Sequence, residues 1–121
     1  MLLHGACILV CEDEPFIALD LALSIEDAGG QVVGPAASIA EARALLATTA
    51  VSGAILDVHL SDGEVTPIAV QLLEGGVPVV VQTGVGLPSD LKARYPALPV
   101  HTKPVFPQHL IAKLASQIAP A

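Results

Sequence analysis

Residues 6–15 read ACILVCEDEP, an apolar run followed by an acidic turn and a proline. The apolar run predicts a β-strand over residues 6–10. Pro15 suits the first turn of a helix and Gly29-Gly30 suits its end, so a helix is predicted over residues 15–28. One face of this helix is apolar and is expected to be buried; it consists of Ile17, Ala18, Leu21, Ile25 and Ala28.

The same order of strand and helix repeats along the chain. Further strands are predicted over residues 31–33, 53–57, 78–82 and 98–102. The helices between them are predicted from local signals. A capping box at Ser38-Ile39-Ala40-Glu41 opens a helix to Thr48, and a Ser61-Asp62-Gly63 turn leads into a helix that ends before Gly75-Gly76. A short helix is predicted over residues 89–95, and a last helix begins at about Pro107 and is expected to bury Leu110, Ile111, Leu114 and Ile118. Five such units predict an α/β fold, a parallel doubly wound sheet in a single domain over residues 1–121.

Composition supports a sheet that is buried on both faces. The chain is 53% hydrophobic, and its only aromatic residues are Phe16, Tyr95 and Phe106. The core must therefore consist of Val, Leu, Ile and Ala, which suits a covered parallel sheet.

Charge and hydropathy exclude several classes of partner. The formal net charge is −7, and the five Lys and Arg residues are scattered, so direct nucleic-acid binding is not expected. No apolar run is long enough to span a membrane, and the N-terminus lacks the pattern of a signal peptide. These features predict a cytoplasmic protein.

Two cysteines, Cys7 and Cys11, fall in the first predicted strand. Four residues of extended chain hold them roughly 13 Å apart, too far for a disulfide. We interpret them as reduced, partly buried thiols.

Chemically active side chains follow the predicted strands. The first strand ends in Glu12-Asp13-Glu14, the third in Asp57, the fourth in Thr83-Gly84 and the fifth in Lys103-Pro104. Because a parallel sheet gathers these ends at one edge, we expect carboxylates, a hydroxyl and an ammonium in one site.

Carboxylates this close repel one another unless positive charge offsets the repulsion. A hard divalent cation on Asp13 and Asp57 would supply it, as would Lys103 beside Asp57. Such a site suits phosphoryl transfer with Asp57 as the nucleophile. The remaining phosphoryl oxygens would contact Thr83 and two backbone N–H groups, those of Val58 and Gly84.

The set Glu12-Asp13, Asp57, Thr83-Gly84 and Lys103-Pro104 resembles the receiver domain of two-component response regulators, over essentially the whole chain. The stretch that includes the end of the third strand, residues 56–63 (LDVHLSDG), belongs to the same motif set. The resemblance implies a flavodoxin-like (βα)5 fold with strand order 2-1-3-4-5.

The resemblance also implies roles for the matching residues. Asp57 would accept a phosphoryl group from phosphohistidine, and Lys103 and Thr83 would contact that group. Mg²⁺ would be bound by Asp13, Asp57 and the carbonyl of His59, with Glu12 acting through water. The domain would catalyse only its own phosphorylation and dephosphorylation, and is therefore not expected to be an enzyme in the usual sense.

Partners are implied as well. A histidine kinase or a histidine phosphotransfer protein would supply the phosphoryl group. The resemblance is to a stand-alone receiver, for which we expect no output domain and direct binding of an effector protein by a monomer or a weak dimer; a piece of a hybrid kinase or of a regulator with an output domain is the alternative.

The switch region departs from the family pattern. Many receivers carry Phe or Tyr three residues before the lysine, where this chain has Val100. Residues 81–86 (VQTGVG) loosely resemble the Phe-Ala-Thr-Gly motif of an alphaproteobacterial single-domain subgroup, but Val85 stands where an aromatic would follow. We therefore expect activation to be transmitted by a loop shift or a smaller side chain, and residues 84–88 to be mobile.

Each of the four histidines has an expected place in the fold. The side chain of His59 is expected at the mouth of the site, either steering water or simply exposed in a loop. His101 is expected to be partly buried on an edge strand, with a part in the switch as the alternative. His4 and His109 are expected at the surface.

Three other functions remain open. A degenerate receiver would act as a constitutive protein-binding module. A small Asp-nucleophile phosphatase would need a second Asp at the position of His59. A flavodoxin-like cofactor binder would need a phosphate loop where Glu12-Asp13-Glu14 stands.

Overall fold

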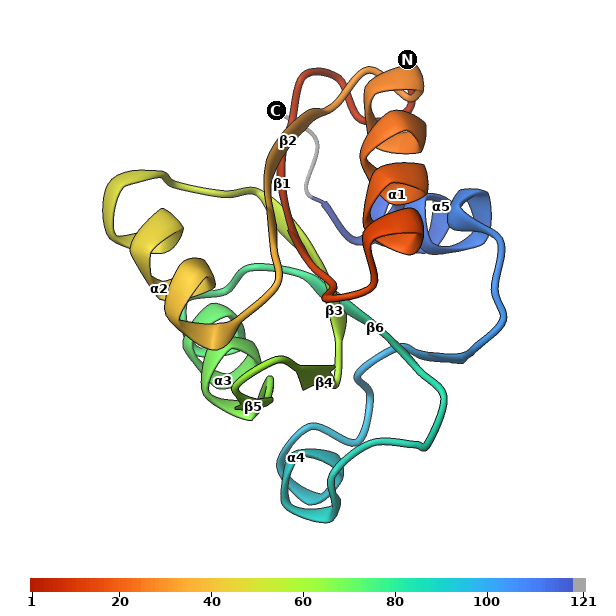
Figure 1. Cartoon of the computed structure of the whole chain (residues 1–121). Helices are drawn as coiled ribbons and strands as arrows, with labels where there is room; N and C mark the ends of the chain where they lie inside the picture. The colour runs from red at the N-terminus through yellow and green to blue at the C-terminus, as the bar shows by residue number, and fades with distance from the viewer. Residues whose placement is uncertain (119–121) are drawn as a thin grey trace.

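A parallel five-stranded sheet forms the centre of the fold (Figure 1). The structure is a computed structural model and describes residues 1–118. The strands lie in the order β2-β1-β3-β6-β7, which confirms the predicted order of a flavodoxin-like sheet. Their bounds are β1 Cys7–Cys11, β2 Gln31–Ala36, β3 Gly53–Asp57, β6 Val79–Thr83 and β7 Val100–Thr102.

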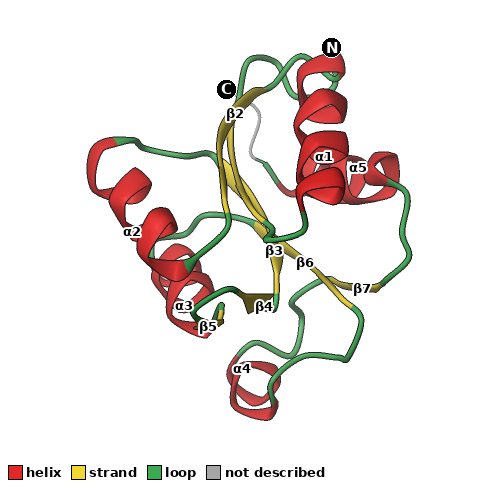
Figure 2. Cartoon of the chain, viewed as in Figure 1, coloured by secondary structure: helices red, strands yellow, loops and turns green. Residues whose placement is uncertain are grey.

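Helices cover both faces of this sheet (Figures 1 and 2). Helices α1 (Pro15–Asp27) and α5 (Pro107–Gln117) pack on one face. On the other lie α2 (Ile39–Thr48), α3 (Thr66–Glu74) and the short α4 (Ser89–Arg94). The predicted doubly wound sheet, buried on both faces, is therefore confirmed.

The core contains no buried phenylalanine, as the composition predicts. Ile55 faces the α1/α5 layer, and the next residue of the strand, Leu56, faces the α2/α3/α4 layer. Phe16 and Phe106 are 81% and 71% exposed. Val, Leu, Ile and Ala thus provide almost all of the apolar burial that stabilises the fold.

Helix α1 begins immediately after the acidic turn that carries the site. The carboxylate of Glu14 accepts a hydrogen bond from the N–H of Ile17 at 2.8 Å and so caps the helix, with Pro15 in its first turn. Its buried positions are Ala18, Leu21 and Ile25. Of the predicted apolar face, Ile17 and Ala28 are only partly buried, and the helix ends at Asp27, one residue earlier than predicted.

β3 has its predicted bounds, and the other four strands of the parallel sheet differ from the prediction by one to three residues. β2 continues to Ala36, three residues beyond its predicted end, because Ala36 pairs with Cys11 across the sheet. β1 and β6 each lie one residue further along. β7 is shorter than predicted, because its pairing with β6 begins only at Val100.

A hairpin follows β3, where a direct turn into a helix was predicted. Strands β4 (His59–Leu60) and β5 (Gly63–Glu64) pair antiparallel before α3 begins. Between them, the carboxylate of Asp62 accepts hydrogen bonds from the N–H groups of Ile39 (2.7 Å) and Ala40 (3.2 Å). The hairpin therefore closes over the N-terminus of α2.

Of the two hydrogen bonds in the predicted capping box of α2, one has the expected partners and the other has a different donor. The hydroxyl of Ser38 accepts a hydrogen bond from the N–H of Glu41 at 3.0 Å. The Glu41 carboxylate accepts its bond from the N–H of Ala37, at 2.7 Å, one residue before the cap. In α5, Leu110, Ile111 and Leu114 are buried as predicted, but Ile118 is only partly buried and lies beyond the helix end.

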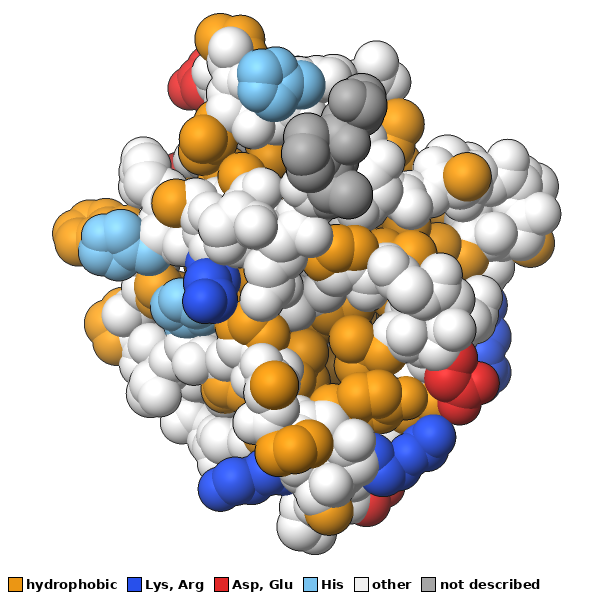
Figure 3. All heavy atoms as spheres, turned by 180° about the vertical axis from the view of Figure 1, so that it is seen from behind, with side chains coloured by type: hydrophobic (Ala, Val, Ile, Leu, Met, Phe, Trp, Pro, Cys, Tyr) orange, Lys and Arg blue, Asp and Glu red, His pale blue; other side chains and the backbone are white. Residues whose placement is uncertain are grey.

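The surface combines charged and apolar areas. Seen from behind, apolar side chains gather near the centre of the molecule, and most acidic and basic side chains lie toward its rim (Figure 3). Among residues 1–118, none of the helices has the length and apolar character needed to cross a bilayer.

Candidate functional site

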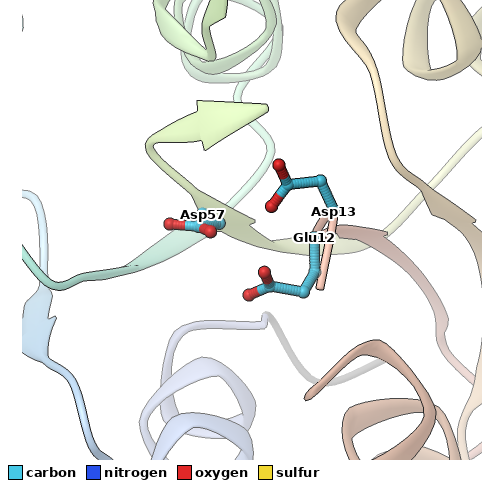
Figure 4. A group of neighbouring side chains, drawn as sticks. All are labelled: Glu12, Asp13 and Asp57. Carbon is cyan, nitrogen blue, oxygen red and sulfur yellow. The ribbon is translucent and has the colours of Figure 1, made fainter. Parts of the chain in front are cut away.

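Three carboxylates meet at the carboxyl edge of the sheet (Figure 4). Glu12 and Asp13 follow β1, and Asp57 is the last residue of β3. Each offers an oxygen within 4.8 Å of the other two. The cause is register: Cys11 pairs with Leu56, so the residues that follow them lie side by side. This confirms the predicted juxtaposition.

Lys103 joins this cluster from the loop after β7. Its Nζ lies 3.0 Å from Oδ2 of Asp57 and 3.1 Å from Oε2 of Glu12. Its backbone N–H donates to the carbonyl of Thr83 at 2.9 Å, which ties the loop to the end of β6. The predicted pairing of Lys103 with Asp57 is present, and Lys103 pairs with Glu12 as well.

Burial raises the electrostatic cost of this cluster. Glu12 is 2% exposed and Asp57 7%, whereas Asp13 is exposed. Burial raises the pKa of Glu12 to about 7, although the hydrogen bond from Lys103 acts in the opposite direction. Burial also disfavours the charged form of Lys103, but its hydrogen bonds to Asp57 and Glu12 outweigh this and raise its pKa. Lys103 therefore stays protonated at neutral pH.

Gln82 is a member of the site that the sequence analysis did not identify. It lies in β6 and is 2% exposed, and its Nε2 donates to Oε2 of Glu12 at 3.0 Å. The other oxygen of Glu12 accepts from the N–H of Glu14 at 3.1 Å. With the bond from Lys103, three protein donors hold the Glu12 carboxylate. The available signal was a single amide in an otherwise apolar strand.

Thr83 lies at the end of β6 as predicted, but its hydroxyl is directed into the following loop. Oγ1 accepts hydrogen bonds from the N–H groups of Val85 (3.1 Å) and Gly86 (3.2 Å) and donates to the carbonyl of Gly86 (3.2 Å). Within residues 1–118 it makes no hydrogen bond to Asp57 or Lys103. In this arrangement Thr83 stabilises the β6–α4 loop.

The backbone positions expected at a phosphoryl group flank the acidic cluster. Val58 follows Asp57 and is buried, whereas Gly84 follows Thr83 and is exposed. A Cβ at Gly84 would have no heavy atom within 4 Å, so space is open beside its peptide group. His59, in β4, is exposed and pairs with Glu64 in the hairpin. The roles predicted for these three residues stay predictions.

The donor set fits a hard divalent cation. Three carboxylates converge, and Lys103 is the one cation of residues 1–118 within hydrogen-bonding distance of any of them. Asp13 makes no ion pair among these residues. Oxygen ligands with excess negative charge are the kind that Mg²⁺ prefers. Asp13 and Asp57 would bind it directly, and Glu12, already held by three donors, through water.

The remaining histidines and the cysteines lie where the sequence indicated. His4 and His109 are exposed. His101 is partly buried on the edge strand β7, and burial lowers its pKa, with Lys113 and His109 acting in the same direction. Cys7 and Cys11 are both free thiols, and burial raises the pKa of Cys11 to about 12.

Solved structures share this fold. SdrG from Sphingomonas melonis Fr1 is 31% identical, with a TM-score of 0.77 over 95% of this chain and 97% of SdrG. The response regulator PhyR from Brucella abortus is 28% identical, with a TM-score of 0.76 over 94% of this chain. The CheY-like receiver domain protein from Methanospirillum hungatei JF-1, 24% identical, shows the fold alone, with a TM-score of 0.82 over 94% of each chain. The chain belongs to the family of response regulator receiver domains.

The matches cover different shares of the solved chains. The receiver domain spans 48% of the Brucella PhyR chain, about half its length. No protein-family model matches the sequence, and no curated protein matches it. Family membership therefore follows from the similarity to solved structures, together with the acidic cluster typical of a phosphoacceptor site.

Valine occupies the position at which the family resemblance implies an aromatic switch residue. Val100, in β7, is 39% exposed, so a small apolar side chain lies at the surface where the resemblance implies an aromatic ring. Val85, in the loop held by Thr83, is 75% exposed. The side chains at both positions lack a polar atom that could follow a movement of the Thr83 hydroxyl.

Proposed function

We propose that this receiver domain accepts a phosphoryl group from a phosphohistidine of a partner protein onto Asp57, with Mg²⁺ bound, and signals in the cytoplasm by protein–protein interaction. The observation that carries the proposal is the 3.0 Å contact between Lys103 Nζ and Asp57 Oδ2 inside a cluster of three carboxylates. This combination provides a nucleophilic oxygen and, beside it, a positive charge for the incoming phosphoryl oxygens.

The reaction transfers the phosphoryl group from an imidazole nitrogen to a carboxylate oxygen. An Asp57 oxygen forms a bond to phosphorus while the bond from phosphorus to the imidazole nitrogen breaks. The electron pair of the broken bond stays on that nitrogen, and nothing is oxidised or reduced. Bound Mg²⁺ would neutralise charge on the carboxylates and the phosphoryl oxygens.

Asp57 is favoured over the other two carboxylates as the acceptor. Glu12 is fully engaged by Lys103, Gln82 and the N–H of Glu14. Asp13 is exposed and does not contact Lys103. Asp57 combines an ion pair to Lys103 with a position at the strand end, where the backbone of Val58 and Gly84 and a rotated Thr83 could hold the remaining oxygens.

We propose that the domain catalyses only its own phosphorylation and dephosphorylation. A phosphatase of the Asp-nucleophile type needs a second acid two residues after the first, and that residue here is His59. His59 is exposed in the β4–β5 hairpin, close in sequence to the acceptor, and could orient water during hydrolysis.

The donor is proposed to be a histidine kinase or a histidine phosphotransfer protein. Helix α1 starts directly after the acidic turn and exposes Phe16 and Leu19, which are 81% and 55% exposed. A partner that presents a phosphohistidine to Asp57 could bury this apolar face at the same time. An effector protein could bind elsewhere on the phosphorylated domain.

The test is phosphorylation by a small donor. The wild-type chain is incubated with acetyl phosphate and Mg²⁺, and its intact mass is measured. We expect the mass of one phosphoryl group to be added, to be absent in Asp57→Ala and to be retained in Asp27→Ala, an exposed carboxylate at the end of α1. Wild-type protein without an adduct at any Mg²⁺ concentration would refute the proposal.

One alternative has an observation in its favour. The Thr83 hydroxyl is engaged by its own loop and Val100 replaces the aromatic, which would suit a degenerate receiver that binds a partner constitutively. The mass experiment separates the two functions, because a degenerate receiver forms no adduct. Turnover of a phosphate ester would instead indicate a phosphatase.

A further inference from the structure

Gln82 is a buried polar side chain that the proposed chemistry does not use. Its residue is 2% exposed and pairs in register with Asp57 on the neighbouring strand. An amide buried in a sheet is costly unless it is hydrogen bonded. Its side chain makes its bond to Oε2 of Glu12, at 3.0 Å. The amide is therefore directed at the acidic cluster.

Two donors share that oxygen of Glu12. Gln82 Nε2 lies 3.0 Å from Oε2 and Lys103 Nζ lies 3.1 Å from it, while the same Nζ lies 3.0 Å from Asp57. A phosphoryl group on Asp57 would attract the ammonium away from Glu12. Glu12 is 2% exposed, so bulk water cannot replace the lost donor, and a buried carboxylate oxygen that has lost its charged partner is strongly unfavourable unless another donor holds it.

We propose that Gln82 is a positioning residue, whose amide holds Oε2 of Glu12 so that Lys103 is free to move onto the phosphoryl group at Asp57. The inference rests on the proposed function. An amide suits this role because it carries no charge: it neither competes with Lys103 for Asp57 nor repels a bound cation.

Gln82 and Lys103 differ in how firmly they are held. Gln82 is buried and is fixed by the backbone of β6, an interior strand of the sheet. Lys103 lies in the loop after β7, its side chain is 22% exposed, and it borders a pocket of about 300 Å³ with Ile17 of α1 and Leu110 of α5 among its walls. The Lys103 side chain is therefore less confined than that of Gln82.

The test compares Gln82→Met with Gln71→Met. Met keeps the length of the side chain but removes the amide, and Gln71 is exposed on α3, away from the cluster. With acetyl phosphate and saturating Mg²⁺, we expect Gln82→Met to acquire the phosphoryl mass about tenfold more slowly than wild type, the size expected from one lost hydrogen bond to a charged group. Gln71→Met should match wild type.

A double-mutant cycle shows whether Gln82 acts through Glu12. In a Glu12→Ala background the further change Gln82→Met should have no effect on the rate, because no carboxylate remains to be held. An equal slowing in both backgrounds would overturn the inference. Gln82→Asn, which keeps an amide but shortens the side chain, should slow the reaction as Gln82→Met does and guards against a variant that fails to fold.

A second readout does not depend on phosphorylation. In metal-free protein, the carboxyl-carbon NMR resonance of Glu12 should shift in Gln82→Met and stay unchanged in Gln71→Met; an unchanged resonance in Gln82→Met would overturn the inference.

Failure of the proposed function and failure of this inference can be told apart by the phosphorylation experiment. Wild type without an adduct overturns the proposed function and this inference with it, whereas equally fast adduct formation in wild type and Gln82→Met overturns the inference alone.

Discussion

Lys103 Nζ lies 3.0 Å from Oδ2 of Asp57, although 46 positions separate the two residues in the chain. The sheet produces this contact: β7 pairs with β6, and β6 pairs with β3, so both residues emerge at one edge. The ion pair is partly buried, and the same ammonium also forms an ion pair with the Glu12 carboxylate. The charge of Lys103 therefore links the two buried carboxylates of the site.

Replacing Lys103 should reduce phosphorylation strongly. In Lys103→Met we expect the rate with acetyl phosphate to fall by about 100-fold, because a preorganised charge next to the developing phosphoryl charge is lost. The rate of mass gain measures this. Lys92→Met, at an exposed position in α4, is the matched control and should react like wild type. A Lys103→Met rate within a factor of two of the control would contradict this role.

Stability without metal should fall as pH rises from about 4.5 to about 7. Burial raises the pKa of Glu12 from its ordinary 4.5 to about 7, so the folded state binds a proton that the unfolded chain has released. The Glu12 contribution is therefore fully present below about pH 4.5 and is lost as pH rises through about 7. The loss is at most about 3 kcal/mol in the free energy of unfolding.

Urea unfolding at pH 5 and pH 8 in the presence of a chelator measures this dependence. Glu12→Gln should remove most of the difference between the two pH values, and Glu26→Gln, at an exposed position in α1, should leave it in place. If Glu12→Gln shows the same pH dependence as wild type, Glu12 is not the group responsible.

Magnesium should stabilise the folded protein, and this effect should depend on Asp13. At a Mg²⁺ concentration 100 times the dissociation constant, binding to the folded state alone adds about 2.7 kcal/mol. Asp13 is exposed and makes no ion pair among residues 1–118, so Asp13→Asn should keep the metal-free stability. Thermal unfolding with Mg²⁺ and with chelator measures both effects. Asp27→Asn should retain the full Mg²⁺ response, and a full response in Asp13→Asn would exclude Asp13 as a ligand.

Thr83 should determine the order of the β6–α4 loop in the unphosphorylated protein. Thr83→Val keeps the shape but removes the oxygen that accepts from Val85 and Gly86, so their amides should exchange faster and stability should fall by about 1–2 kcal/mol. Thr83→Ser should preserve both, and Thr102→Val, at an exposed position in β7, serves as a control. Unchanged exchange at Val85 and Gly86 would show that the hydroxyl does not hold the loop. The same experiment measures whether residues 84–88 are mobile, as the sequence predicts.

The acidic site could be predicted because its residues lie at fixed places in a repeating pattern. Each of Glu12, Asp13 and Asp57 directly ends or follows an apolar run, and parallel strands bring such positions together. The β4–β5 hairpin could not be predicted in this way. Its anchor is the hydrogen bond that the N–H of Ile39 donates to the Asp62 carboxylate, which depends on two segments 23 residues apart.

The end of β2 could not be predicted for the same reason, because it depends on a contact with a residue distant in the sequence. The second strand was predicted to end at residue 33, and the two residues that follow it, Gly34 and Pro35, both favour turns. The strand continues because Ala36 finds a partner in Cys11 on β1. Pairing across the sheet outweighed the local preference.

The sequence by itself determined the alternation of strands and helices, the apolar core without phenylalanine, and the identity of the residues at the edge of the sheet. Periodicity and strand-end position are local properties, so they can be read from neighbouring residues. Only the tertiary structure decided that Glu12 is buried with a raised pKa, that Gln82 holds it, and that the Thr83 hydroxyl is directed into its own loop. These features depend on burial and on contacts between separate strands and loops, which no local pattern specifies.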